Sequence, residues 1–190
     1  MSNVKKSYHF IRVSKNLKAD LLVWSQFLEK FNGISYIQDR NCTSNSTTEL
    51  YTDSAGGGVA KDCGAYYAGK WTYLQWPTYC YHTEMLRDIT YLELVPITLS
   101  IYLWGYQFIN KKVLFHTANA AVVSILNNTS SKYDRITSLL RPTMYWTLLL
   151  NFQFKAKHVF SDDNCIADAI SRGQVERFRR LAPPADAYPC

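Results

Sequence analysis

The feature that most constrains the fold is a change of pattern part-way along the chain. Residues 47–76 contain short alternating segments separated by a Gly-rich turn and an Ala-Gly-Lys break, which is typical of strands joined by tight turns. From residue 89 onward, short apolar segments alternate with segments of helical period. Strands joined by tight turns favour an antiparallel meander, and strands separated by helices favour parallel crossover pairs. An α/β fold is therefore expected, with a five-stranded mixed sheet flanked by helices.

The same patterns assign each expected element to a range. Strands are expected at 49–53, 63–69, 70–76, 111–117 and 152–160. Helices are expected at 16–31, 88–108, 119–128, 133–151 and 164–172. Pro142 is expected to bend or break its helix, whereas Pro96 is tolerated best if it lies in a first turn.

Length and composition set the domain organisation. The chain has 190 residues, of which 47% are hydrophobic, which is enough for one packed domain with an appendage. We expect an N-terminal appendage at 1–46, the α/β domain at 47–173, and a linker at 174–190 that is rich in Arg and then in Pro. The net charge of +6 fits a polyanion partner, although many basic proteins bind none.

Several classes of protein are disfavoured. The first ten residues lack the apolar core of a signal peptide, and the most apolar stretch, 89–109, contains Glu93 and Pro96, so we expect neither secretion nor a membrane helix. The five cysteines are scattered without a Cys-x-x-Cys pair, which fits free thiols in a reducing, intracellular compartment and no zinc site. The protein is therefore expected in the cytoplasm or the nucleus.

Acidic residues lie where α/β sheets collect their ligands. Asp53 ends the first strand, Glu93 lies on the first helix of the second half, and Asp168 lies on the last helix. Carboxylates gathered at one edge repel each other unless a cation compensates them, and Mg²⁺ is the natural partner. Each acid alone has an ordinary interpretation, as a turn residue, a helix-dipole partner or a helix surface residue. The prediction of a metal site therefore depends on the three acids occurring together in this order along the chain.

Four segments carry a family resemblance, and they occur in the expected order. They read YTDSAGG, ITYLELVPI, LFHTANAAVV and KHVFSDDNCIADAISR, and together they cover residues from about 47 to 172. They resemble the ribonuclease H domain of retroelements, in particular of tyrosine-recombinase (DIRS-type) retrotransposons. Residues 8–38 resemble the end of the reverse transcriptase that precedes this domain, and the C-terminal segment resembles the stretch that leads to the recombinase. The last motif is the most specific of the four.

The resemblance implies a ribonuclease H-like fold and endonucleolytic hydrolysis of RNA in an RNA–DNA hybrid. It implies two Mg²⁺ ions, with Mn²⁺ as an alternative, held by Asp53 as the shared ligand, by Glu93 and by Asp168. His158 matches the position of a histidine that some members use near product release, although a strand-end histidine is more often packed on the sheet. The hybrid, together with reverse transcriptase and recombinase modules of a parent polyprotein, would be the partners.

Ala118 departs from the family pattern. The third motif usually carries an Asp at this position, and a methyl group cannot replace an anionic oxygen ligand. Enzymatic activity is therefore expected to be weak or absent while the fold survives. The change fits either decay or repurposing of an element, or an alanine introduced to trap substrate. A nucleic-acid-binding domain without catalysis, and a transposase or integrase of the same superfold, stay as alternatives.

Candidate contacts to nucleic acid surround the acids. They are Ser54, Gly56, Asn119, Lys155, Lys157 and Arg172. The arginines at 177, 179 and 180 add the densest local charge, which is equally typical of a solvated linker. Aromatic residues of the meander are expected in the core more often than stacked on bases.

Overall fold

A five-stranded mixed sheet forms the centre of the molecule. The computed structural model describes residues 12–31, 33, 47–55 and 62–190. The strands are β1 (Thr47–Ser54), β2 (Asp62–Tyr67), β3 (Lys70–Gln75), β4 (Lys112–Thr117) and β5 (Gln153–His158). Their order is β3-β2-β1-β4-β5; β1, β2 and β3 pair antiparallel, while β4 pairs parallel with both β1 and β5. The expected meander followed by parallel crossovers is confirmed.

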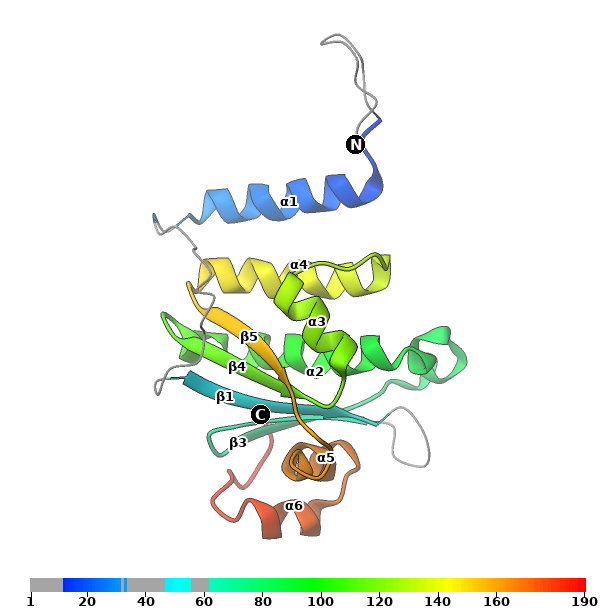
Figure 1. The fold of residues 1–190 in the computed structure, drawn as a ribbon, viewed down its shortest axis with the longest axis vertical. Coiled ribbons are helices and arrows are strands. Elements are labelled where there is room, and N and C mark those ends of the chain that lie inside the picture. The colour runs from blue at the N-terminus through cyan, green and yellow to red at the C-terminus, as the bar shows by residue number, and fades with distance from the viewer. Residues whose placement is uncertain (1–11, 32, 34–46, 56–61) are drawn as a thin grey trace.

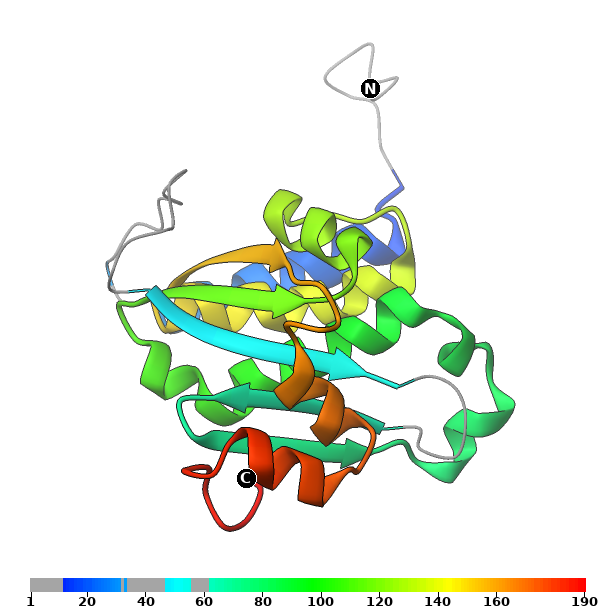
Figure 2. The same ribbon diagram turned by 60° about the horizontal axis from the view of Figure 1, so that its bottom comes forward.

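Helices cover both faces of this sheet in layers, as Figure 1 shows. The helices are α1 (Lys15–Glu29), α2 (Ile89–Trp104), α3 (Ala120–Asn128), α4 (Asp134–Leu149), α5 (Cys165–Ser171) and α6 (Val175–Leu181), with short 3₁₀ segments at Thr78–His82, Glu84–Arg87 and Gly105–Phe108. The second to fourth helices pack on one face and enclose the main core, and α1 packs outside α4. The other face carries α5 and α6 (Figure 2). Among the described residues, no helix has the length and apolar character needed to cross a bilayer.

Aromatic side chains fill the main core between the sheet and α2. Phe115 of β4 and Phe154 of β5 pack with ring centroids 5.7 Å apart, and both are fully buried. Trp104, at the end of α2, lies against Tyr67 of β2. Large buried rings contribute the greatest apolar area per residue, so this cluster anchors α2 to the central strands. The expected assignment of strand aromatics to the core holds for Tyr67, Trp71 and Trp76, which are all buried.

Two prolines lie inside helices, contrary to the sequence expectation. Pro142 does not break α4, which continues from Asp134 to Leu149, and Pro96 lies in the interior of α2 and not in its first turn. A proline removes one helical hydrogen bond, and tertiary packing compensates for it here. In α4 the next residue, Thr143, is fully buried and its hydroxyl lies 3.2 Å from that of Thr98 on α2.

The C-terminal segment is part of the folded domain and does not form the linker that was expected. Phe178 of α6 is almost fully buried against Trp71 of β3, with ring centroids 4.8 Å apart. Beyond the helix, Asp186 N–H donates to the Gly69 carbonyl, and Cys190 N–H donates to the Trp71 carbonyl on the outer edge of the sheet. The segment therefore covers an edge strand that would otherwise expose unpaired backbone groups.

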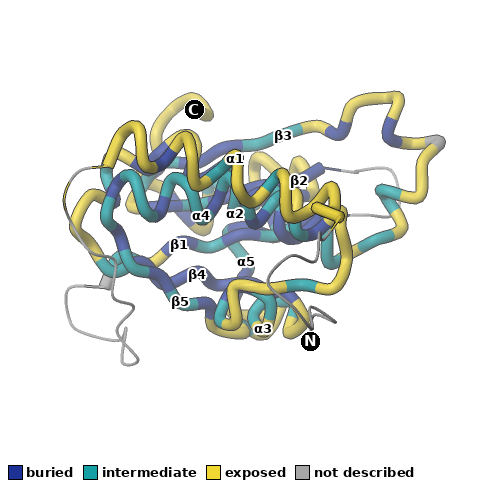
Figure 3. Tube along the Cα trace, turned by 90° about the horizontal axis from the view of Figure 1, so that it is seen from above, coloured by how far each residue is buried: buried dark blue, intermediate teal, exposed yellow. Residues whose placement is uncertain are grey.

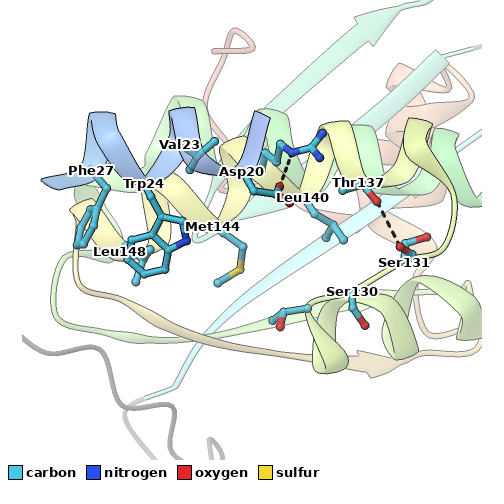
Figure 4. Close-up of a pocket in the computed structure, with 12 residues that line it drawn as sticks. Asp20, Val23, Trp24, Phe27, Ser130, Ser131, Thr137, Leu140, Met144 and Leu148 are labelled. Atoms are coloured by element: carbon cyan, nitrogen blue, oxygen red, sulfur yellow. Dashed lines mark hydrogen bonds and ion pairs between the residues drawn. The ribbon is translucent and has the colours of Figure 1, made fainter. Parts of the chain in front are cut away.

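The N-terminal helix α1 rests on α4 across a cavity of about 390 Å³ (Figure 4). Trp24, Phe27 and Leu148 are among the apolar residues that line it, while Asp20 accepts a hydrogen bond from Arg141 at 2.7 Å. Most of the outward side of α1 is exposed, as Figure 3 shows. The cavity lies across the sheet from α5 and holds no acid other than the paired Asp20, so it is separate from the predicted site.

Candidate functional site

Asp53 lies at the end of β1 on the face that α5 covers. Alternation along the strand sends Ser54 toward α2 and Asp53 toward α5. Asp53 Oδ2 accepts a 2.5 Å hydrogen bond from the Ser171 hydroxyl. Burial is the largest influence and raises the pKa of Asp53, with a further rise from the charge of Asp168, while the Ser171 hydrogen bond opposes both. Asp53 is therefore a half-buried carboxylate with one hydroxyl donor and another acid nearby.

A glycine allows α5 to approach the sheet closely enough for this contact. Gly64 of β2 pairs with Asp53, and a β-carbon at Gly64 would lie 2.3 Å from the side chain of Ile170. Asn164, at the start of α5, donates from Nδ2 to the Thr52 carbonyl at 2.9 Å. The helix is thus fixed to the sheet at both ends, which holds Asp168 and Ser171 beside the end of β1.

Glu93 approaches the same point from α2, and Pro96 helps to fix it there. Because Pro96 has no N–H, the Leu92 carbonyl has no helical donor four residues on. That carbonyl instead accepts a 2.8 Å hydrogen bond from the Ser54 hydroxyl, which ties α2 to the end of β1 next to Glu93. Glu93 Oε2 accepts from the Thr117 hydroxyl at 3.2 Å.

The environment of Glu93 favours its protonated form. Burial and the negative charge of Asp53 raise the pKa of Glu93 to about 8, against the weaker effect of the Thr117 hydrogen bond. Asp53 is half-buried and Glu93 is buried, and each carboxylate faces the negative charge of the other. The Ser171 hydroxyl donates to Asp53, while the Thr117 hydroxyl and the Ser54 backbone N–H donate to Glu93. Such a pair favours a proton or a cation between its members.

Asp168 has a different environment, because two arginines hold it. Arg172 Nε donates to Oδ1 at 2.5 Å, and Arg177 Nη1 donates to Oδ2 at 2.6 Å. Burial raises the pKa of Asp168, but the hydrogen bonds and charges of the two arginines together hold it below its usual value. Both carboxylate oxygens are therefore already bound to cationic groups.

Ala118 is half-buried just after β4, next to the Thr117 that contacts Glu93. Its carbonyl oxygen lies 3.1 Å from Nε2 of His158. His158 is exposed at the end of β5 and contacts Phe160 edge to face, with centroids 5.5 Å apart. The histidine lies at the same edge as the acids and is not packed into the core. Its proposed part in product release remains a prediction.

A divalent cation fits only part of this arrangement. The described residues contain no group of three or more His, Cys, Asp or Glu side chains placed to hold a metal ion, so the three-acid set expected from the sequence is not assembled. Asp53 and Glu93 alone match Mg²⁺, which needs only one or two carboxylates when a substrate phosphate completes its coordination. Asp168, held by arginines, and Ala118, which has no side-chain oxygen, do not match a second ion.

The residues expected to contact nucleic acid have varied environments. Lys157 and Arg172 are exposed and Lys155 is half-buried, all on the acid-bearing side. Ser54 is buried and committed to Leu92, and Asn119 Oδ1 caps α3 by accepting from the N–H groups of Ala121 and Val122. Gly56 lies outside the described residues.

Arg179 also proves to be structural. It stacks over Trp71 and Phe178 and donates to backbone carbonyls of the C-terminal segment, including that of Asp186 at 2.8 Å. Arg179 is therefore not part of a solvated linker, as the sequence interpretation of the arginine cluster had it. Its guanidinium group is already bound to the C-terminal segment, so it is not a free phosphate ligand.

Three site residues escaped the sequence analysis. Ser171 donates to Asp53 and Thr117 donates to Glu93, while Arg177 was noted only for its charge and not for its contact with Asp168. Ser171 follows Asp168 by three residues, which places both on one side of a helix, so its spacing was a usable signal. Nothing in the local sequence links Thr117 to Glu93.

Comparisons with known proteins add a likeness at the level of the chain trace. No family model matches the sequence, and no curated protein matches it. Ribonuclease H1 from the halophilic archaeon Halobacterium salinarum NRC-1 aligns over 68% of this chain and 98% of its own, with 14% identity and a TM-score of 0.46. LC11-RNase H1, solved in complex with an RNA/DNA hybrid, aligns over 68% of this chain and 99% of its own, with 12% identity and a TM-score of 0.47.

The raised pKa of Glu93 gives a stability prediction. Between the ordinary pKa of 4.5 and about 8, the native state keeps a proton that the unfolded state releases, so stability falls as pH rises through this window. Glu93→Gln removes that cost. In EDTA its advantage over the parent should grow from under about 1 kcal/mol at pH 5 to roughly 1–4 kcal/mol at pH 8.5, given about 1.4 kcal/mol per pKa unit. Urea unfolding at several pH values measures it.

Glu84→Gln is the matched control, because Glu84 is exposed and pairs with the exposed Arg87. Its effect should stay within about 0.5 kcal/mol at every pH. Adding Mg²⁺ should reduce the advantage of Glu93→Gln. An advantage that is the same at pH 5 and pH 8.5 would show that Glu93 is ionised in the native state across this range.

Proposed function

We propose that this chain is a weakened ribonuclease H that cleaves the RNA strand of RNA–DNA hybrids with one divalent cation. The observation that carries the proposal is the convergence of Asp53 and Glu93, from β1 and α2, as a carboxylate pair in which partial or full burial raises the pKa of both acids. The ribonuclease H resemblance of the motifs that supply these two residues supports the substrate class. The retroelement origin of the chain, with reverse transcriptase and recombinase modules beside it in an intracellular polyprotein, belongs to the same proposal.

Each residue has a separate part in this proposal. Asp53 and Glu93 hold Mg²⁺ or Mn²⁺, and the ion supplies positive charge that polarises the phosphodiester. Ser171 and Thr117 fix the orientation of the two carboxylates by donating to one oxygen of each. Ala118 leaves the pair without the third acid of the family pattern, which accounts for weak activity. His158 lies at the same edge, where it meets the departing product.

Cleavage of a labelled RNA–DNA hybrid tests the proposal. We expect slow, endonucleolytic, Mg²⁺- or Mn²⁺-dependent cleavage of the RNA strand, and at least a tenfold loss in Asp53→Asn, because the amide cannot supply an anionic ligand. Asp186→Asn, in the C-terminal segment, is the matched control and should leave the rate unchanged. Cleavage that Asp53→Asn does not alter would contradict the proposal, and strand transfer between DNA duplexes would favour a transposase.

A second candidate is binding without catalysis. It is favoured by the loss of the acid at position 118 and by the arginines that occupy Asp168. This alternative predicts salt-sensitive binding of the hybrid with no cleavage in either Mg²⁺ or Mn²⁺. The cleavage assay above separates the two candidates directly.

A further inference from the structure

Helix α6 brings an arginine into the acid site from outside the motifs that resemble ribonuclease H. Arg177 lies in the first turn of α6 and donates to Asp168 on α5 at 2.6 Å, while Arg172 donates to the other oxygen of the same carboxylate. Two guanidinium groups on one carboxylate leave a local charge of about +1, since arginine stays protonated in proteins. The Asp168 side of the site is therefore cationic, although its acid is a family ligand.

The two arginines are anchored on one side and open on the other. Arg177 Nη1 also donates to Gln174 Oε1 at 2.9 Å, and α6 is itself fixed by the buried Phe178. The side chains of Arg172 and Arg177 nevertheless remain 54% and 39% exposed. An open hollow of about 540 Å³, lined by residues 173–177 and by Arg180, borders Arg177. A ligand can therefore reach donors whose positions are already set.

Ser171 connects the arginine pair, Arg172 and Arg177, with the acid pair, Asp53 and Glu93. Its hydroxyl donates to Asp53, and Arg172 is the next residue in the chain. A phosphodiester placed at this junction would meet the Asp53–Glu93 pair, with its cation, on one side and two guanidinium groups on the other. The arrangement suits a group that carries negative charge on two non-bridging oxygens.

We propose that Arg172 and Arg177 form a phosphate-binding half-site that holds the polynucleotide backbone beside the Asp53–Glu93 pair. The inference rests on the proposed function and deepens it, because the guanidinium pair would bind the phosphate charge beside the acids that would hold the cation. Phosphate is favoured over an acidic peptide because the planar guanidinium fork matches two oxygens of one phosphate, and because both donors point to a single small site.

Binding in the absence of divalent ions tests the half-site without the cation. Fluorescence anisotropy with a labelled RNA–DNA hybrid in EDTA compares the parent with Arg177→Gln, Arg177→Lys and Arg87→Gln. Arg87 is the matched control, because it also pairs with an acid but lies on the Glu84–Arg87 segment. We expect Arg177→Gln to weaken binding five- to twentyfold and to lower the salt slope by about one, as for one lost phosphate contact. Arg177→Lys should keep the slope and lose less affinity.

The outcomes separate this inference from the proposed function. Equal affinity and slope for Arg177→Gln and Arg87→Gln, or no binding of the hybrid by the parent, would overturn the half-site. Competition by polyglutamate at the same charge concentration as the hybrid would overturn the preference for phosphate. If Arg177→Gln fails to fold, as judged by circular dichroism, an unchanged slope in Arg177→Lys supports the half-site and a slope lowered by one overturns it. Arginine-dependent binding without cleavage, even in Ala118→Asp, supports the half-site and counts against the nuclease.

Discussion

Ala118→Asp is expected to raise Mg²⁺-dependent cleavage of an RNA–DNA hybrid by about 10²–10³-fold. The substitution places a carboxylate immediately after Thr117, whose hydroxyl already contacts Glu93. The cation that we propose for Asp53 and Glu93 would gain a third anionic ligand. Loss of one electrostatic element of a catalytic site typically costs about 3–4 kcal/mol of transition-state stabilisation, which corresponds to the expected gain. Single-turnover cleavage of a labelled RNA strand measures it.

Two further variants identify the cause of any gain. Ala118→Asn has nearly the same shape as the aspartate variant without its charge, so it should gain less than tenfold. Ala120→Asp adds the same charge two residues later, at an exposed position in the first turn of α3, and should leave the rate unchanged. No gain in a well-folded Ala118→Asp protein would count strongly against a ribonuclease H, because the proposal attributes weak activity to the missing acid at this position.

The same variant should also change the response of stability to Mg²⁺. A third carboxylate beside Asp53 and Glu93 adds repulsion, so Ala118→Asp should unfold at a lower temperature than the parent in EDTA. Mg²⁺ should then raise its melting temperature by more than that of the parent, because binding to the native state alone stabilises it. This readout does not depend on catalysis, and so it tests cation binding separately from turnover.

The parts of the site that could be predicted follow from backbone topology. Asp53 lies near the end of a strand and Glu93 lies near the start of a helix. Because ligand sites collect beyond the ends of strands, the sequence predicts that the two acids lie close together. The close approach of Asp53 and Glu93 depends on side-chain packing, which the hydrophobic periodicity of the sequence does not predict. Gly64 admits α5, and Pro96 frees the Leu92 carbonyl for Ser54. Only coordinates reveal such contacts between residues far apart in sequence.

The environment of Asp168 could not be predicted, because it depends on partners and not on position. The sequence places Asp168 on a helix, and Arg172 four residues later is a standard helical pair. Arg177 reaches the same carboxylate only because the chain turns after α5 at Gly173, which has a positive φ of 63°. The expected three-acid set thus becomes an acid pair beside an arginine-bound acid.

The C-terminal segment shows how composition can conceal a packed element. Its arginines and prolines indicated a linker, yet Phe178 and Ala182, four residues apart, form a buried stripe on α6. Apolar residues at this spacing share one helix face. Two buried positions are too few to give a clear periodic signal in a short helix, and therefore the charge dominated the interpretation.

Phe178→Ala is expected to destabilise the protein by about 3–5 kcal/mol. The ring is 1% exposed and packs on Trp71, so its removal leaves a cavity between α6 and β3. Val175→Ala is the matched control on the same helix, because Val175 is 57% exposed, and it should cost under about 1 kcal/mol. Urea unfolding with an unchanged m-value measures both. Because α6 carries Arg177, Phe178→Ala should also weaken hybrid binding at temperatures where the domain remains folded. A cost for Phe178→Ala no larger than that for Val175→Ala would mean that residues 174–190 behave in solution as the linker that their composition indicates.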